Sequence, residues 1–233
     1  MEVKRMKVAI IGGSGKMGRW FADFLLREGQ EVTIIGRDEK KLLAVKQQLD
    51  VEVATSIAAV EKADVVLISV PIDSFEGVVR QLQPCLRPEQ IVMDITSIKA
   101  LPVEIMHKYL KTGRVLGTHP VFGPGAKDIV NKNFVLTPTT EEETALAQKI
   151  KGYLEARGAR VALMMPQDHD EMMAVILGLA HFIAIVSAET LLNFENLQQM
   201  SAIGGSTYKL LLTLAESVIS EDADFYASLQ MNL

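Results

Sequence analysis

The sequence is short of residues on which several protein classes depend. A single cysteine, Cys85, occurs among its 233 residues, which excludes an internal disulfide framework and a zinc site built from four thiolates. So few thiols are typical of a reducing compartment. We therefore interpret Cys85 as a buried structural residue and predict a cytoplasmic protein.

Positive charge is also scarce. Lys and Arg number 24 against 29 Asp and Glu, for a formal net charge of -5, and the basic residues are scattered singly. A nucleic-acid-binding protein would present a basic patch or stripe, so a small-molecule partner is favoured and no nucleic acid is expected. His169-Asp170-Glu171 forms an H-x-E, but the paired cysteines of a zinc deaminase are missing. We predict no metal site.

Long apolar runs are few. Val8–Ile11 stops at Gly12 and is too short for a signal-peptide core. Met172–Ser187 carries no formal charge and reaches the lower length limit of a membrane span. It contains His181 and follows a soluble α/β pattern, so we interpret it as a helix buried between protein surfaces and predict no membrane partner.

Short apolar runs alternate with segments of helical spacing, which is typical of βαβ units. Runs that are unbroken in this way are expected of parallel strands buried on both faces. The pattern predicts an α/β fold that begins with a Rossmann domain, whose sheet is doubly wound and mostly parallel. The predicted strands are Val8–Ile11, Val32–Ile35, Val51–Ala54, Val65–Val70, Ile91–Asp94, Val115–Thr118 and Phe134–Thr137.

The strand rhythm stops after Val161-Ala162-Leu163. Pro166-Gln167-Asp168 is typical of a connection whose aspartate caps the next helix. We predict a Rossmann domain over residues 1–165 and a smaller all-helical domain over residues 166–233. Its expected helices are Asp168–Asn193, Thr207–Glu216 and Asp222–Leu229.

A glycine-rich turn, Gly13-Ser14-Gly15-Lys16-Met17-Gly18, follows the first strand and opens the first helix. In this context a G-x-G-x-x-G predicts dinucleotide binding: one glycine makes the turn, one admits the pyrophosphate, and Gly18 lets the helix pack closely. The helix N-terminus offers N–H groups and partial positive charge to the phosphates. A Walker-type phosphate loop is excluded because Ile10 and Met17 break its pattern.

The second predicted strand ends in Gly36-Arg37-Asp38. Arg37 stands where the 2′-phosphate of NADP would lie, and a guanidinium can pair with that phosphate or stack on adenine. We therefore favour NADP, while Asp38 keeps NAD open as the alternative.

Two further strand ends carry candidate chemistry. His119 follows Val115–Thr118 and precedes a loop rich in proline and glycine, at the sheet edge where open α/β folds bind ligands. An imidazole there can accept a proton from an alcohol as hydride leaves. After Ile91–Asp94, Ser97 and Lys99 are predicted to hydrogen-bond substrate, although a helix start capped by Thr96 or Ser97 would explain the same segment.

The other histidines are less informative. His107, within the helix predicted over Leu101–Leu110, is interpreted as a surface residue. His181 lies mid-helix among apolar neighbours, where a hydrogen-bonded core histidine is the usual state. The residues alone leave its role open.

Six segments, taken together, form a pattern that covers essentially the whole chain. They are Gly13–Gly18, Asp94–Lys99, Gly117–Pro124, His169-Asp170, His181-Phe182 and Tyr208-Lys209. With these residues the chain resembles the prephenate dehydrogenase family, which oxidatively decarboxylates prephenate or arogenate on the route to tyrosine. The histidine-proline-x-phenylalanine-glycine-proline segment is the most specific of the six.

The resemblance implies roles for individual residues. His119 matches the histidine that binds the ring hydroxyl of the substrate and takes its proton, and Ser97 matches the serine that supports this contact. His181 matches a histidine that the second domain contributes to the active site. Lys209 falls near an arginine that holds a substrate carboxylate, although an ammonium is a poorer bidentate partner than a guanidinium.

The resemblance also implies function and assembly. We expect NAD(P)-dependent conversion of prephenate to 4-hydroxyphenylpyruvate. The alternatives are an arogenate dehydrogenase, another Rossmann oxidoreductase that uses NADP, and a non-catalytic regulator that binds NAD(P). A substrate-binding and dimerisation domain, shortened at its end, would follow the Rossmann domain. Because Met172–Ser187 is too apolar to face water, we predict a homodimer.

Overall fold

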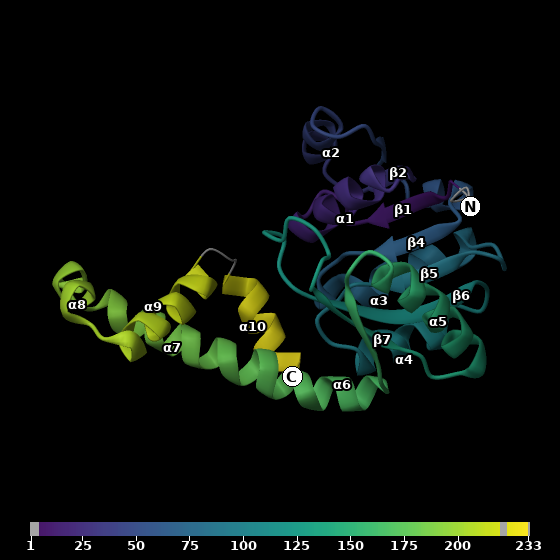
Figure 1. Ribbon diagram of the computed structural model, residues 1–233. Helices are drawn as coiled ribbons and strands as arrows, with labels where there is room; N and C mark the ends of the chain where they lie inside the picture. The colour runs from purple at the N-terminus through teal and green to yellow at the C-terminus, as the bar shows by residue number, and fades with distance from the viewer. Residues whose placement is uncertain (1–4, 220–222, 233) are drawn as a thin grey trace. The chain divides into compact units, whose positions relative to one another are not determined.

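The computed structural model describes residues 5–219 and 223–232, and the chain divides into two compact units, Met1–His169 and Asp170–Leu233 (Figure 1). We expected a boundary after residue 165. The first unit extends to His169 because this side chain is fully buried and contacts His119. The start of the predicted helix at Asp222 lies outside the described residues.

The first unit is built on an eight-stranded sheet, with the strand order β3-β2-β1-β4-β5-β6-β7-β8. Neighbouring strands run parallel except for the antiparallel pair β6 and β7. The predicted Rossmann fold with a mostly parallel sheet is confirmed. The strands are β1 (Lys7–Ile11), β2 (Glu31–Ile35), β3 (Glu52–Ala54), β4 (Val65–Ile68), β5 (Ile91–Asp94), β6 (Arg114–Val121), β7 (Asn133–Thr137) and β8 (Arg160–Leu163).

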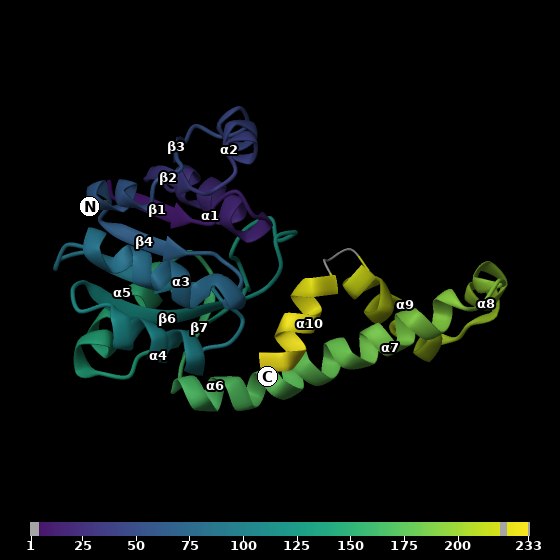
Figure 2. The ribbon, with the colours of Figure 1, turned by 180° about the vertical axis from the view of Figure 1, so that it is seen from behind.

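Helices cover both faces of the sheet. Val8 and Ile10 pack with the helices on one face, and Ala9 and Ile11 with those on the other, because successive strand residues point to opposite faces. The first face carries α1 (Lys16–Arg27), α2 (Glu39–Lys46) and α5 (Glu141–Glu155). The second face carries α3 (Ile72–Leu82), α4 (Ala100–Tyr109) and the 3₁₀ turns η1 (Ile57–Lys62) and η2 (Gln83–Cys85) (Figure 2).

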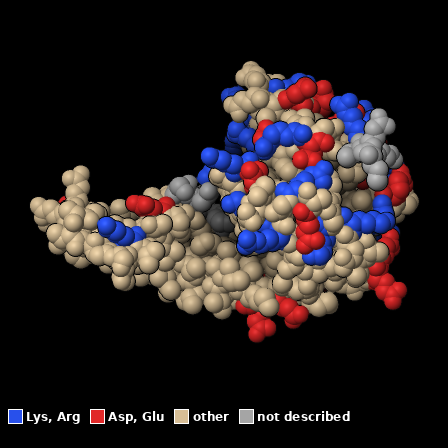
Figure 3. Space-filling model, in the orientation of Figure 1, with Lys and Arg blue, Asp and Glu red and all other residues tan. Residues whose placement is uncertain are grey.

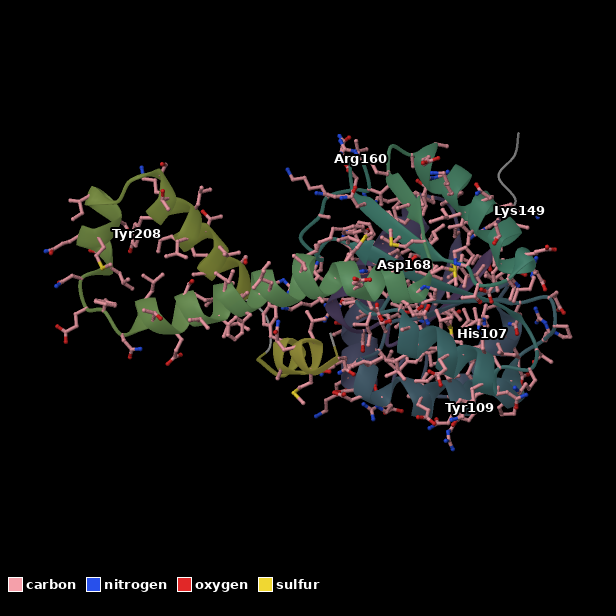
Figure 4. The ribbon with its side chains drawn as sticks, turned by 90° about the horizontal axis from the view of Figure 1, so that it is seen from below. His107, Tyr109, Lys149, Arg160, Asp168 and Tyr208 are labelled. Carbon is pink, nitrogen blue, oxygen red and sulfur yellow. The ribbon has the colours of Figure 1, made fainter. Side chains whose placement is uncertain are left out.

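The start of α5 is tied to α4 by an ion pair. Thr140 caps α5 by accepting a hydrogen bond from the Glu143 N–H at 3.2 Å, and Glu143 accepts from the Thr139 N–H at 2.7 Å. His107 Nε2 lies 2.6 Å from the Glu143 carboxylate. The prediction that His107 lies at the surface is confirmed, since 36% of its side chain is exposed, but its pairing with Glu143 was not predicted (Figure 4).

This pair should make stability depend on pH. The hydrogen bond to Glu143 raises the pKa of His107 above its ordinary value of 6.5, against a smaller effect of burial. The contribution of the pair is thus fully present between the ordinary pKa of the Glu143 carboxyl, 4.5, and pH 6.5, and it is lost as pH rises through the folded pKa of His107. We expect His107→Gln to lower the free energy of unfolding by about 0.5–1 kcal/mol at acidic pH, and by less at alkaline pH, in urea titrations. An equal loss at both pH values would contradict this assignment.

The second unit is helical. Its small core joins Ala184, Ala188 and Leu191 to Ala215 and Val218. The helix that we predicted over Asp168–Asn193 contains a π-helical segment, and a short helix after it was not predicted. The elements are α6 (Pro166–Met173), which begins in the first unit, η3 (Ala174–Leu179), α7 (Ala180–Leu192), α8 (Leu197–Ile203), α9 (Ser206–Ile219) and α10 (Ala223–Asn232).

Much of the long helix is exposed in the single chain. The continuous stretch Pro166–Leu192 is long and apolar enough to cross a membrane, and its most apolar 18-residue window has a mean hydropathy of 2.0, yet only 22% of that window is buried. Val175 is 61% exposed and Phe182 is 56% exposed. Few charged side chains interrupt the helical unit in the view of Figure 3. The expectation of a buried helix is therefore wrong for one chain, because too few helices pack against this one.

Candidate functional site

Four connections meet at one edge of the sheet in the first unit. Strands β1, β2, β4 and β5 are parallel to one another, and β6 is parallel to β5. Their carboxyl ends therefore lie along the same edge, where open α/β sheets bind ligands. This edge gathers the glycine turn, Arg37, the segment Asp94–Lys99 and His119.

The glycine turn is shaped by close backbone contacts. Gly12 has φ +78°, and a Cβ there would overlap the Ser69 carbonyl oxygen. A Cβ on Gly18 would lie 2.6 Å from the Gly13 Cα, which is the close packing of α1 that we predicted for this glycine. Helix α1 begins at Lys16 with Gly15 as its N-cap, and no side chain caps it. The turn can therefore admit a phosphate at the helix N-terminus.

Arg37 and Asp38 lie in the turn after β2 and are both exposed. The Asp38 carboxylate accepts a hydrogen bond from the Lys41 N–H at 3.1 Å and so caps α2. The capping role gives Asp38 a structural function. The exposed residue Arg37 precedes it, at the sheet edge where open α/β folds bind ligands.

Asp94 and Lys99 form an ion pair with both side chains fully buried. The Asp94 carboxylate also accepts hydrogen bonds from the Thr96 N–H at 3.0 Å and from the Thr96 hydroxyl. The Lys99 ammonium donates to the Thr96 hydroxyl at 3.1 Å and to the Thr118 carbonyl at 2.7 Å. Lys99 itself is the N-cap of α4, so the alternative in which Thr96 or Ser97 caps this helix is wrong.

The side chains of Asp94 and Lys99 also hydrogen-bond the backbone of β6 just beyond the end of β5. The register of β5 and β6 ends at Asp94 and Gly117. One residue later, the Thr118 N–H donates to the Asp94 carboxylate at 3.3 Å and the Thr118 carbonyl accepts from Lys99. We expected the strand to end at Thr118, but pairing with β7 carries it to Val121. Pro120 is tolerated because β5 no longer pairs with it.

His119 therefore lies within the strand rather than in the loop after it. Its side chain is buried, and its Nδ1 lies 2.8 Å from Nε2 of His169, which is fully buried in the first turn of α6. The two rings meet edge to face, with centroids 5.0 Å apart. Burial lowers the pKa of His119 well below its ordinary value of 6.5, and the positive charge of Lys99 lowers it further. His119 is thus neutral at pH 7 and able to accept a proton.

The loop after β6 is fastened to the helix of the glycine turn. Trp20 on α1 donates its indole N–H to the Ala126 carbonyl at 2.5 Å. Its ring meets Phe122 edge to face at 4.9 Å and stacks on Phe24 at 5.7 Å. The glycine turn and the segment that carries His119 are thereby held in one packed cluster.

Comparison with known proteins identifies the family to which the chain belongs. The nucleotide-binding domain model of prephenate dehydrogenase matches residues 21–163, which is more than half of the chain. The chain belongs to the prephenate dehydrogenase family. The family predicted from the sequence is thus confirmed.

Curated relatives in this family match almost the whole chain. The probable arogenate/prephenate dehydrogenase of Methanocaldococcus jannaschii is 33% identical over 99% of this chain and 53% of its own length. The T-protein of Haemophilus influenzae is 32% identical over 97% of this chain and 56% of its own length. The chain spans about half the length of these two relatives.

Solved structures share the fold. Prephenate dehydrogenase from A. aeolicus, in complex with hydroxyphenyl propionate and NAD+, has a TM-score of 0.79 at 24% identity and covers 99% of this chain and 84% of its own. Synechocystis arogenate dehydrogenase has a TM-score of 0.74 at 22% identity and covers 97% and 84%. At these identities the likeness establishes the fold of a prephenate dehydrogenase.

The predicted site residues of this prephenate dehydrogenase family member fall in both units. The first unit brings Lys99 beside His119, with the ammonium buried against protein partners, and leaves Ser97 partly exposed after β5. His181 and Lys209 lie on α7 and α9 of the second unit. His181 Nδ1 is buried without a hydrogen-bond partner among the described residues. Substrate contact by these side chains stays a prediction.

Two residues of the site were missed from the sequence. His169 was considered as part of an H-x-E and of the family pattern, but not as a partner of His119, because this contact joins residues 50 positions apart. Asp94 was seen as a strand end and not as the partner of Lys99. The short spacing of Asp94, Thr96 and Lys99 after a buried strand could have indicated a hydrogen-bonded cluster. In the part of the chain that the structure describes, no group of three or more His, Cys, Asp or Glu could hold a metal ion.

Proposed function

We propose that this chain carries the NAD(P)-dependent dehydrogenase activity of its family and converts prephenate to 4-hydroxyphenylpyruvate, a step of tyrosine biosynthesis. The observation that carries the proposal is the buried, neutral His119 at the carboxyl edge of the sheet, in the same packed unit as a dinucleotide-type glycine turn. Family membership supplies the reaction class.

The glycine turn fits a dinucleotide. Side chains are excluded at Gly12 and Gly18 by backbone contacts, so the backbone of the turn stays bare where a pyrophosphate would approach α1. When bound, the nicotinamide ring supplies the hydride acceptor. Arg37 is exposed after β2, and because a guanidinium can pair with a 2′-phosphate, this residue supports our preference for NADP. NAD remains the alternative, since it is the dinucleotide bound to the A. aeolicus relative.

The protein side of the reaction needs orientation and one proton acceptor. Hydride leaves the ring carbon that bears the hydroxyl, and His119 accepts the hydroxyl proton as the carbonyl forms. The substrate carboxylate then leaves as carbon dioxide, and aromatisation drives the step. Ser97 supports the hydroxyl contact, and His181 and Lys209 bind the substrate. Arogenate shares the ring and would use the same base, so it is the alternative substrate.

An assay with both substrates and both cofactors tests the proposal. The purified chain is mixed with prephenate or arogenate and with NAD or NADP, and absorbance of the reduced nicotinamide is followed. We expect signal with prephenate, matched by 4-hydroxyphenylpyruvate, and a higher kcat/KM with NADP. Signal only with arogenate would change the substrate. Silence with both, while dinucleotide still binds, would favour a regulator over an enzyme.

We also propose that the exposed apolar helix packs against a second copy in a cytoplasmic homodimer. Val175 and Val186 are 61% and 48% exposed on a helix too apolar to face water. Light scattering should give twice the mass of one chain for the wild type, and one chain mass for Val175→Glu combined with Val186→Glu. Gln198→Glu, on α8, is the matched control. A monomeric wild type, or a requirement for detergent, would contradict the dimer.

A further inference from the structure

The imidazole of His119 has a second imidazole as its neighbour. His169 Nε2 lies 2.8 Å from His119 Nδ1, and the two side chains are 0% and 4% exposed as residues. Building on the proposed function, we propose that His169 is a positioning residue that selects the tautomer of His119, accepting its Nδ1–H so that Nε2 presents a lone pair to the substrate.

Two proton arrangements satisfy a hydrogen bond between neutral rings. In one, His119 carries its proton on Nδ1 and donates it to His169, which leaves His119 Nε2 unprotonated. In the other, His169 donates from Nε2, and His119 must then carry its proton on Nε2. Only the first arrangement leaves His119 with a nitrogen that can accept a proton from a hydroxyl group.

The surroundings of the pair keep His119 neutral before reaction. The groups that face His119 are the ammonium of Lys99, at the start of α4, and the imidazole of His169, on α6. Asp94 on β5 pairs with Lys99 and balances its charge. Burial and the nearby ammonium disfavour imidazolium at His119. The hydrogen bond to His169 therefore determines the tautomer of His119 and not its charge.

The contact matters again once the proton has moved. The substrate O–H bond breaks, its proton forms a bond with His119 Nε2, and the electron pair left on oxygen forms the carbonyl as hydride departs to the dinucleotide. His119 then carries protons on both nitrogens. Its Nδ1–H still needs an acceptor in a buried site, and a His169 whose Nε2 is unprotonated supplies one.

The tautomer can be read directly from nitrogen chemical shifts. Uniformly ¹⁵N-labelled protein is examined by long-range ¹H–¹⁵N correlation at neutral pH, and His119 and His169 are assigned from spectra of H119N and H169Q. We expect a protonated Nδ1 and an unprotonated Nε2 on His119. A protonated Nε2 on His119 would overturn the proposal, whether or not the protein turns over prephenate.

Kinetics provide the second test. His169→Leu removes the acceptor and should lower kcat about 100-fold, with the KM for dinucleotide changed by less than about twofold. His169→Gln keeps an oxygen or nitrogen near the position of Nε2 and should recover kcat to within about tenfold of the wild type. His107→Gln is the matched histidine control, because His107 on α4 pairs with Glu143 and not with a predicted site residue. A kcat for His169→Leu within about fivefold of the wild type would overturn the proposal.

The two tests separate this proposal from the proposed function. A wild-type chain that is inactive with prephenate and arogenate but carries Nδ1–H on His119 would contradict the proposed function and support the proposed role of His169. An active wild type with Nε2–H on His119 would support the proposed function and contradict the proposed role of His169. If His169→Leu fails to fold, the wild-type nitrogen spectrum still decides.

Discussion

Replacing His119 with asparagine should reduce kcat with prephenate about 1,000-fold and leave dinucleotide affinity unchanged. General-base catalysis by a positioned imidazole contributes about 10²–10⁴-fold, and burial keeps His119 in the neutral form that can act as the base. Asparagine is smaller, and its amide cannot accept the proton at pH 7. Steady-state kinetics and a separate titration of dinucleotide binding measure the two effects.

The expected split between kcat and cofactor binding is the informative part. His119 lies on β6, whereas the glycine turn joins β1 to α1, so the substitution should spare the dinucleotide. Thermal unfolding of the variant gives the control for folding. Unchanged turnover with the folded H119N protein would remove His119 from the role of base, and loss of dinucleotide affinity would point to a structural defect.

Replacing Lys99 with methionine is expected to lower the free energy of unfolding by about 3–5 kcal/mol, which is the cost of leaving a buried charge without its partner. Both side chains of the Asp94–Lys99 pair are fully buried. The ammonium also donates a hydrogen bond to the buried Thr118 carbonyl, so the substitution leaves this carbonyl without that donor. Urea unfolding monitored by circular dichroism measures the loss.

A double variant isolates the charge. Asp94→Asn in the Lys99→Met background removes the uncompensated carboxylate, so it should regain part of the lost stability. We predicted from the sequence that Lys99 binds substrate. If that were its main role, Lys99→Met would fold with near-wild-type stability and show a raised KM for prephenate, which would contradict the structural role.

Most of the first unit could be predicted because its signals are local. Unbroken apolar runs mark the strands, and the glycine turn directly after β1 requires a helix to pack close to its first residues, as the backbone contacts at Gly18 show. The parallel order of the strands then places Arg37, Asp94 and His119 on one edge of the sheet. Topology thus converts short sequence patterns into a common site.

The remaining features depend on contacts between distant residues. Strand β6 passes Thr118 because β7 pairs with it and because Asp94 and Lys99 bond its backbone where β5 has ended. The His119–His169 contact arises only when the start of α6 packs against β6. For Met172–Ser187, hydrophobicity indicates burial but does not reveal that a single chain leaves it uncovered.

The position of Trp20 gives the protein an optical property. It is the only tryptophan in the sequence, and it links α1, which follows the glycine turn, to Phe122 and Ala126 in the segment after His119. Fluorescence excited selectively in tryptophan therefore comes from one known position. Its quantum yield and emission wavelength report on this junction alone, so the unlabelled protein carries its own single-site fluorophore beside the proposed cofactor turn.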